Sequence, residues 1–189
     1  MLLNKVLSVA LGALFLLMFA CDGPSSGTGA QQLTQRTKNR TLQDDPIFWD
    51  YAASSNMLQT EISRCAAEKS SSEQVKAMAG KAVDFHSRAL RQLRKLVANQ
   101  EHLQLPDSLS GADKRLVQEF NSLEGEEFNQ RFRSFIISTH KSQLDRYEEA
   151  LRRTEDQKTR QWLTNMRMHL LEELEQFMAQ DSVQAIEQS

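Results

Sequence analysis

Apolar residues recur at every third or fourth position along four long stretches of the chain. Strict alternation of apolar and polar residues, which is the pattern of a half-buried strand, is almost absent. The stretches run from residue 45 to about 69, from about 71 to 100, from 124 to about 153, and from about 157 to 180. Each of the four therefore predicts a long amphipathic helix, and the fold class is all-α.

Local signals mark where these helices begin and where they are connected. Two aspartates precede Pro46, which suits the first turn of a helix. The run "SSSEQ" at 70–74 offers a serine cap with an acid or amide three positions later. Positions 101–113, "EHLQLPDSLSGAD", form the one substantial interior loop, and a short helix is expected after it, carrying Leu116, Phe120 and Leu123.

Helices joined by short turns pack as antiparallel neighbours, so these signals also predict a topology. We expect an up-down-up-down four-helix bundle, with the short extra helix inserted in the connection between the second and third long helices.

The N-terminal segment, up to Cys21, resembles an export signal. Lys5 provides a small basic region, and a mostly apolar run extends from Val6 to Ala20. A membrane-spanning helix needs about 20 apolar residues, and this run is shorter, so it suits the hydrophobic region of a signal peptide at 1–20. Cys21 follows a small residue, as at a bacterial lipoprotein processing site, and we expect its lipidation. An ordinary cleaved signal peptide and an uncleaved anchor are the alternatives.

Residues 21–44 would then form a lipidated cysteine and a flexible tether, because Gly, Ser, Thr, Gln and Asn predominate there. The folded domain is expected at 45–180, with a polar tail at 181–189. These predictions place the protein in the cell envelope, facing the periplasm or on the outer membrane, with the membrane as partner through the lipid. They leave Cys65 without a disulfide partner in the chain.

The charge pattern excludes one class of partner and identifies no other. The formal net charge is -2, and both signs are interspersed. A basic block, or a basic stripe interleaved with aromatic residues, is missing from the sequence, so nucleic-acid binding is not expected. No protein partner is indicated by the composition.

Three of the four histidines interrupt apolar helix faces, and their spacing places them at one depth. His86 lies about four helical turns after a chain reversal near position 71. His140 lies about four helical turns before a second reversal near position 155, and His169 lies about four turns after it. In an up-down-up-down bundle both reversals are at the same end. At about 1.5 Å of rise for each position, all three side chains then lie roughly 20 Å from that end.

Glu61 on the first helix lies about three helical turns before the first reversal and is offset along the axis by only about 6–8 Å. We therefore expect a Glu61–His86–His140–His169 layer in the core. Imidazole and carboxylate groups suit one transition-metal ion such as Zn, Fe, Cu or Ni, and Glu172 or Glu173 near His169 would add a carboxylate. The alternative is a metal-free layer in which a protonated histidine pairs with Glu61.

The same residues define the candidate functions. A ferritin-type di-iron site needs two Glu-x-x-His pairs, and none is present. No catalytic constellation is identified, which leaves enzymatic activity uncertain and disfavoured. The leading hypothesis is a metal-binding bundle for sensing, storage or envelope protection. The alternatives are a metal-free interaction module or scaffold, and, ranked last, a redox enzyme.

The chain also resembles a bacterial family of exported proteins catalogued as domain of unknown function 4142. The resemblance is carried by these motifs, in chain order: "FWDYAASSNMLQTEI", "QVKAMAGKAVDFH", "LQLPDSL", "LEGEEFNQRF", "ISTH" and "LTNMRMHL". It implies a ferritin-like four-helix bundle, with a glutamate on the first helix and a histidine on each later one, at Glu61, His86, His140 and His169. The chain departs from the family pattern at Phe85, Asn129 and Thr164. The family has no established activity, so the resemblance implies no reaction.

Overall fold

The computed structural model describes residues 41–187, with side chains described up to residue 179. A 3-10 helix, η1, spans Leu42–Asp44. Five α-helices follow it: α2 (Pro46–Lys69), α3 (Glu73–Val97), α4 (Gly111–Ser122), α5 (Gly125–Arg153) and α6 (Gln157–Glu187). The described part of the chain contains no strand. The predicted all-α class is confirmed, whereas the predicted signal peptide, Cys21 and most of the tether lie outside the described residues.

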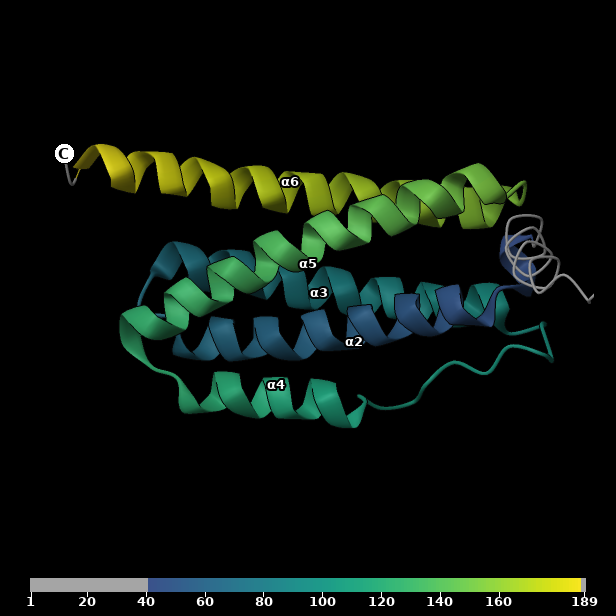
Figure 1. Cartoon of the computed structure of the whole chain (residues 1–189), viewed down its shortest axis with the longest axis horizontal. Helices are drawn as coiled ribbons and strands as arrows, with labels where there is room; N and C mark the ends of the chain where they lie inside the picture. The colour runs from purple at the N-terminus through teal and green to yellow at the C-terminus, as the bar shows by residue number, and fades with distance from the viewer. Residues whose placement is uncertain (1–40, 188–189) are drawn as a thin grey trace, which may run out of the picture. The chain divides into compact units, whose positions relative to one another are not determined.

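The four long helices form a helical bundle, and α4 lies along the outside of α2 (Figure 1). The start of α5 is joined to the α2–α3 turn, because Ser70 Oγ donates to Asn129 Oδ1 at 2.8 Å. The end of α5 is joined to the start of α2 by an ion pair between Arg153 and Asp45 at 2.6 Å. Helix α5 is therefore antiparallel to α2 and parallel to α3.

This order of directions corrects the up-down-up-down prediction. The chain leaves α3 at one end, and residues 98–110 together with α4 carry it back to the other end before α5 begins (Figure 1). Lys69 Nζ donates to the carbonyl of Asn121 at 2.5 Å, which places the end of α4 beside the end of α2. The extra helix was predicted, but the sequence signals did not show that it spans the bundle.

The predicted helix starts agree with the structure to within a few positions. Asp45 accepts a hydrogen bond from the amide of Phe48 at the start of α2, and Ser72 and Ser110 do the same for the third residues of α3 and α4. Gly125 begins α5 with a φ of 58°, a conformation that favours glycine. Helix α6 continues to Glu187, beyond its expected end near 180.

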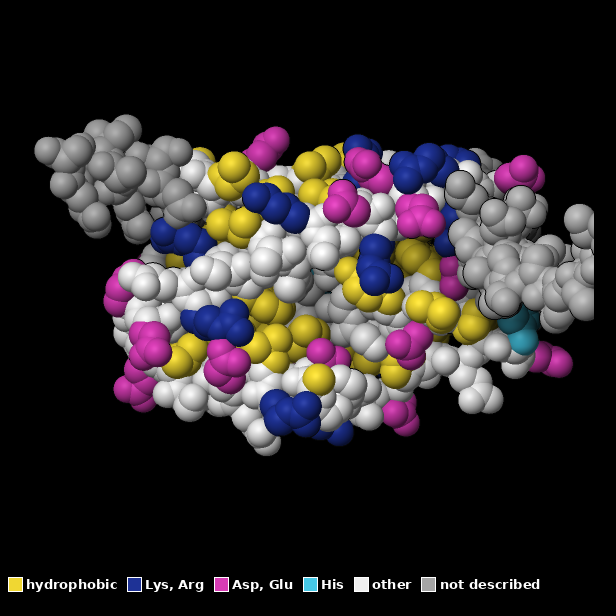
Figure 2. Space-filling model, viewed as in Figure 1, with side chains coloured by type: hydrophobic (Ala, Val, Ile, Leu, Met, Phe, Trp, Pro, Cys, Tyr) yellow, Lys and Arg dark blue, Asp and Glu magenta, His cyan; other side chains and the backbone are white. Residues whose placement is uncertain are grey.

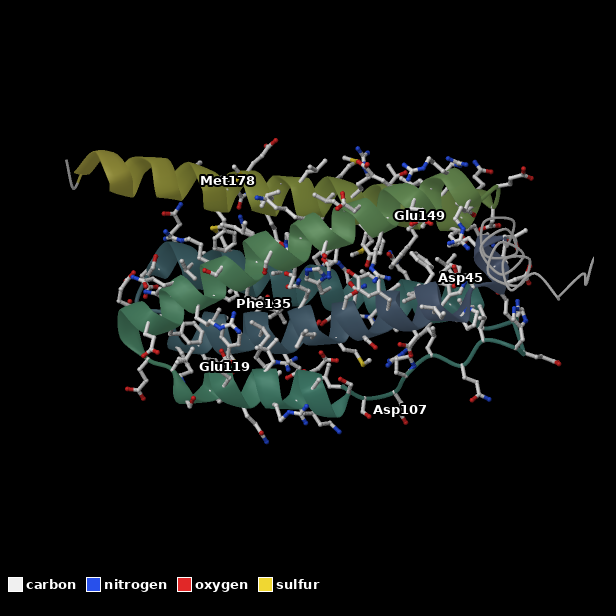
Figure 3. The ribbon with its side chains drawn as sticks, in the orientation of Figure 1. Asp45, Asp107, Glu119, Phe135, Glu149 and Met178 are labelled. Atoms are coloured by element: carbon white, nitrogen blue, oxygen red, sulfur yellow. The ribbon has the colours of Figure 1, made fainter. Side chains whose placement is uncertain are left out.

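Buried apolar side chains form two clusters along the bundle. The phenylalanine cluster, around Ile62, gathers Phe120, Phe128, Phe132, Phe135 and Phe177. Figure 3 shows Phe135 inside the bundle. The tryptophan cluster lies toward the start of α2 and gathers Trp49, Tyr147, Trp162, Leu163 and Leu170 with smaller residues. Both indole N–H groups donate to backbone carbonyls, of Leu42 at 2.8 Å and Ala89 at 3.0 Å, so the two rings are held in fixed orientations.

The surface carries charges of both signs. Figure 2 shows basic and acidic side chains interspersed on the face in view, with hydrophobic side chains between them. None of the helices within residues 41–187 has the length and apolar composition needed to cross a membrane.

Candidate metal centre

Three histidines from three helices converge on one carboxylate in the middle of the bundle. Helix α3 supplies His86, α5 supplies His140, and α6 supplies His169 and Glu173. Their Nε2 atoms lie 3.9, 2.7 and 3.3 Å, respectively, from Oε2 of Glu173. The structure thus brings together the three histidines that the sequence placed at one depth. We refer to these four residues as the histidine layer.

The histidine layer separates the two apolar clusters and is nearly closed to solvent. His86 and His140 are fully buried, and Glu173 is 6% exposed. His169 is the most accessible member, with 16% of its side chain exposed. Its ring stacks on that of Phe85, with centroids 3.4 Å apart and planes at 18°, which fixes the orientation of the imidazole.

A hydrogen bond from α2 sets the tautomer of His86. Asn56 donates through Nδ2 to the carbonyl of Ala52 at 2.7 Å, so its Oδ1 is left to face Nδ1 of His86 at 3.0 Å. Because an amide oxygen only accepts, Nδ1 of His86 carries the proton. Burial lowers the pKa of His86 from 6.5 to about 4, so the ring is neutral at pH 7 and its Nε2 presents a lone pair.

Glu173 is ionised in this setting. Burial acts to raise the pKa of its carboxyl group, but the three imidazoles around it, with His140 in hydrogen-bond contact at 2.7 Å, outweigh burial and hold that pKa well below its usual range. A buried carboxylate requires a positive partner, which must be a protonated neighbouring imidazole or a bound cation.

Several polar atoms of this layer have no partner. Nε2 of His86, Nε2 of His169 and Nδ1 of His140 are buried and make no hydrogen bond within the described residues. Buried polar atoms in native proteins are nearly always paired, so each unpaired atom calls for a ligand, a proton or an internal water. Two of the three atoms face the carboxylate of Glu173.

The donor atoms lie close enough together for one metal ion to contact all of them. One ligand atom each from His86, His169 and Glu173 lies within 4.8 Å of the other two. Tetrahedral coordination with bonds of about 2.0–2.1 Å places donors about 3.3 Å apart. The His169–Glu173 distance of 3.3 Å matches that spacing, and the His86–Glu173 distance of 3.9 Å is longer. The shorter His140–Glu173 contact has the length of a charge-assisted hydrogen bond. His140 therefore suits the role of a residue that orients the metal-binding carboxylate.

Glu61 lies elsewhere and does not join the layer. Its side chain is 41% exposed and pairs with Arg64 at 2.5 Å. The residue of α2 that reaches the layer is Asn56. Glu61 is separated from Asn56 by about 140° of rotation around the helix and by about 7.5 Å along its axis, too far for its carboxylate to turn inward.

The structure shows two contributors that sequence reasoning ranked low or missed. Glu173 was considered only as an added carboxylate, although its i,i+4 spacing from His169 places both on one helix face. Asn56 carried no such signal, because an asparagine on a buried helix face is recognised as a partner only when the facing residue is known.

Comparison with known proteins gives a family and no function. A family model described as a domain of unknown function, DUF4142, matches residues 30–179, and this range includes every residue of the histidine layer. No curated protein matches the chain, and no solved structure matches it. Because the match covers well over half of the sequence, the chain belongs to the DUF4142 family.

Proposed function

We propose that the protein binds a single transition-metal ion through His86, His169 and Glu173, with His140 holding the carboxylate in position. The observation that carries this proposal is the contact between His86 and Glu173. A neutral imidazole presents its Nε2 lone pair to an ionised carboxylate at 3.9 Å, with no hydrogen between the two atoms. Two electron-rich groups facing each other in a buried site are best reconciled by a cation between them.

The donor set favours borderline metals. Neutral imidazole with carboxylate suits Zn, Cu, Fe or Ni, and no thiolate of the described residues is part of the set. Asn56 would act on such an ion indirectly. By accepting the Nδ1 proton of His86, it keeps the lone pair on the nitrogen that faces Glu173, which is how metal-binding histidines are usually oriented.

Thermal melting of the full-length chain tests the proposal. The protein is stripped with a chelator and melted with and without Zn, Cu, Ni or Fe, and the metal content of untreated protein is measured separately. A metal that binds only the folded state stabilises it by about 2.7 kcal/mol at a concentration 100 times its Kd. His86→Ala and Glu173→Gln should abolish the shift, whereas His102→Ala, which changes a half-exposed loop histidine, should retain it.

The competing proposal is a protein-binding scaffold whose histidine layer is a structural polar core without metal. The 2.7 Å contact between His140 and Glu173 favours it, because a protonated His140 would neutralise the carboxylate without any metal. The bundle would then act as a scaffold whose surface binds another envelope protein. Absence of metal from untreated protein, together with unchanged melting in all four metals, would reject the metal proposal and leave this one.

We further propose that the bundle is ferritin-like and anchored in the cell envelope. A single long crossover between two antiparallel helix pairs is characteristic of ferritin-like bundles, and α4 with residues 98–110 supplies one here.

The proposed anchoring in the cell envelope rests on the sequence around Cys21. Metabolic labelling with a fatty-acid analogue should mark the wild type and leave Cys21→Ser unmarked. Equal labelling of both would refute the anchor.

A further inference from the structure

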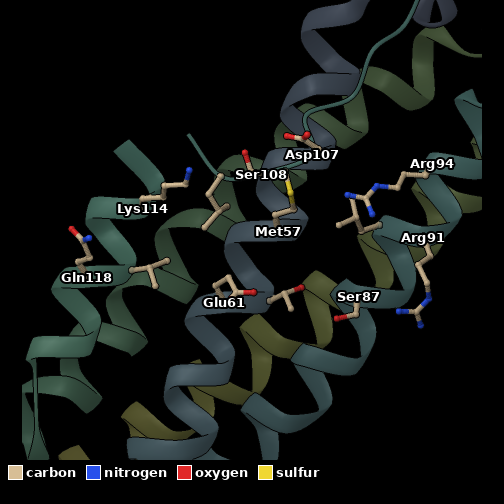
Figure 4. A pocket seen from close by; sticks show the side chains of 13 residues that line it. Met57, Glu61, Ser87, Arg91, Arg94, Asp107, Ser108, Lys114 and Gln118 are labelled. Atoms are coloured by element: carbon tan, nitrogen blue, oxygen red, sulfur yellow. The ribbon is translucent and has the colours of Figure 1, made fainter. Parts of the chain in front are cut away.

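A cavity lies on the α4 side of α2, apart from the histidine layer. It is bounded by α2, α3, α4 and the segment that leads into α4, and it has a volume of about 700 Å³ (Figure 4). That volume is within the range of small-molecule sites, about 300–1,000 Å³. Its apolar lining comes from Met57, Leu90, Leu109 and Val117, which are all half-buried. Side chains of this kind favour an apolar body inside the cavity.

The polar lining of the cavity is dominated by cations. Arg91 and Arg94 from α3 and Lys114 from α4 line it and are exposed. Within the described part of the chain, none of these three side chains makes an ion pair or a hydrogen bond. Figure 4 shows Arg94 and Lys114 extending toward the cavity from opposite walls. These unpaired cations on two walls can contact an anionic ligand without breaking an existing ion pair or hydrogen bond.

The acidic lining does not cancel this charge. Glu61 and Asp107 also line the cavity, but the Glu61 carboxylate is already paired with Arg64, which is not a lining residue. The cavity lining therefore contains three basic side chains and, within the described residues, one carboxylate without an ionic partner, that of Asp107. The balance of charge at the cavity is positive, although the whole chain is slightly negative.

We propose that this cavity binds a small organic anion with an apolar body, namely a carboxylate or phosphate ester that carries an acyl-type chain. Arg94 and Lys114 hold the anionic head from opposite walls, and the four apolar side chains contact the body. Two features of the sequence that take no part in the histidine layer lie at this cavity. Glu61 and residues 107–109 of the "LQLPDSL" motif both line this cavity.

The cavity is separate from the proposed metal centre, although the two share helices. Ser87 lines the cavity and directly follows His86, whose ring turns to the interior of the bundle. Loss of metal through His86→Ala should leave anion binding in place, so the two proposals fail independently.

Isothermal titration calorimetry on the full-length chain tests the proposal, with probes kept below their micelle concentrations. Decanoate and decyl phosphate carry both a chain and an anionic head. Inorganic phosphate lacks the chain, and decyltrimethylammonium reverses the charge of the head. We expect one of the first two to bind at least tenfold more tightly than either of the others. The preferred head then distinguishes a carboxylate ligand from a phosphate ester.

Matched variants locate the site. Arg94→Ala and Lys114→Ala should each weaken binding about tenfold, because each removes a charge-assisted contact. Lys95→Ala and Arg115→Ala change the neighbouring cation on the same two helices, outside this cavity, and should bind as the wild type does. All four positions are exposed, so thermal melts should show unchanged folding.

The following results would overturn the proposal: no binding of decanoate or decyl phosphate, equal binding of decyltrimethylammonium, equal binding of inorganic phosphate, or unchanged affinity in both Arg94→Ala and Lys114→Ala.

Discussion

The phenylalanine cluster and the histidine layer are adjacent parts of one core, and they are built on opposite principles. In the phenylalanine cluster, most ring pairs meet edge to face, as Phe120 and Phe135 do with centroids 5.6 Å apart, and Phe128 stacks on Phe132. Its side chains carry no polar atom that needs a partner. In the histidine layer, His86 and His169 each leave a ring nitrogen without a hydrogen bond beside an ionised carboxylate.

This difference indicates which part of the core serves stability and which serves function. Buried aromatic rings stabilise the fold by removing apolar area from water. A buried ionic cluster often contributes less than apolar residues of the same volume would, so stability alone does not account for its presence. The contrast supports a role for the histidine layer beyond packing, and four predictions test that contrast.

The largest effect is expected from Phe132→Ala in the phenylalanine cluster. Phe132 is 1% exposed and contacts the rings of Phe128 and Phe177. Removing the ring leaves a cavity and should lower the free energy of unfolding by about 3–5 kcal/mol, as measured by urea denaturation. A loss below about 1 kcal/mol would mean that this end of the bundle is not the well-packed region described above.

Acid should destabilise the metal-free protein through the histidine layer. The pKa of His86 is about 4 in the folded state and near 6.5 in the unfolded state. Between these values the unfolded chain binds the extra proton, so stability is full above about pH 6.5 and falls as the pH drops to 4. The expected loss is about 3 kcal/mol, and the lowered pKa of Glu173 extends the loss below pH 4.5.

Urea denaturation at pH 7 and pH 4, in the presence of a chelator, measures this loss. His86→Gln removes the titrating group and should remove most of the loss, whereas His102→Ala should keep it. An identical pH dependence in His86→Gln would show that other groups cause the acid sensitivity.

A smaller effect is expected where α2 meets the layer. Asn56→Ala removes the acceptor of the His86 Nδ1 proton and leaves that N–H unpaired in the core. The variant should lose about 1–3 kcal/mol at pH 7. It should also bind metal more weakly, since the tautomer of His86 is no longer fixed. Calorimetric metal titration beside the denaturation measurement checks both effects, and full stability with unaltered affinity would contradict the assigned hydrogen bond.

The smallest effect is expected at the surface. Arg167 pairs with Glu148 at 3.0 Å, and both side chains are more than a third exposed. Arg167→Ala should change the free energy of unfolding by less than about 1 kcal/mol, because solvent and salt screen such pairs. A larger loss would show that a surface ion pair contributes as much to the free energy of unfolding as a core residue does. The contrast between the phenylalanine cluster and the histidine layer would then not explain the stability of the fold.

The three histidines could be placed from the sequence although the predicted topology was wrong. His86 lies near the middle of α3, which runs from Glu73 to Val97, and His140 lies near the middle of α5, which runs from Gly125 to Arg153. A residue near the middle of a helix keeps almost the same depth whichever way the helix runs. The error in the direction of α5 therefore left the depth of His140 nearly unchanged.

The carboxylate could not be chosen from the sequence in the same way. On α2, the neighbours α3, α4 and α5 bury residues around most of the helix, so the apolar pattern did not show which side faces the other histidines. Glu61 was predicted from its depth and from its helical spacing between Leu58 and Cys65, and rotation about the helix axis excludes it. On α6, Glu172, Glu173 and Glu175 are near one another, and only the packing against α5 shows which of them is buried.

The crossover through α4 has a consequence for how the histidine layer comes into being during folding. The helix pairs α2–α3 and α5–α6 each join segments that are close in sequence, which form contacts rapidly. Asn56 and His86 belong to the first pair, whereas His140, His169 and Glu173 belong to the second. The layer is therefore assembled only when the two pairs dock across the crossover. A spectroscopic metal bound there would report that docking event rather than helix formation.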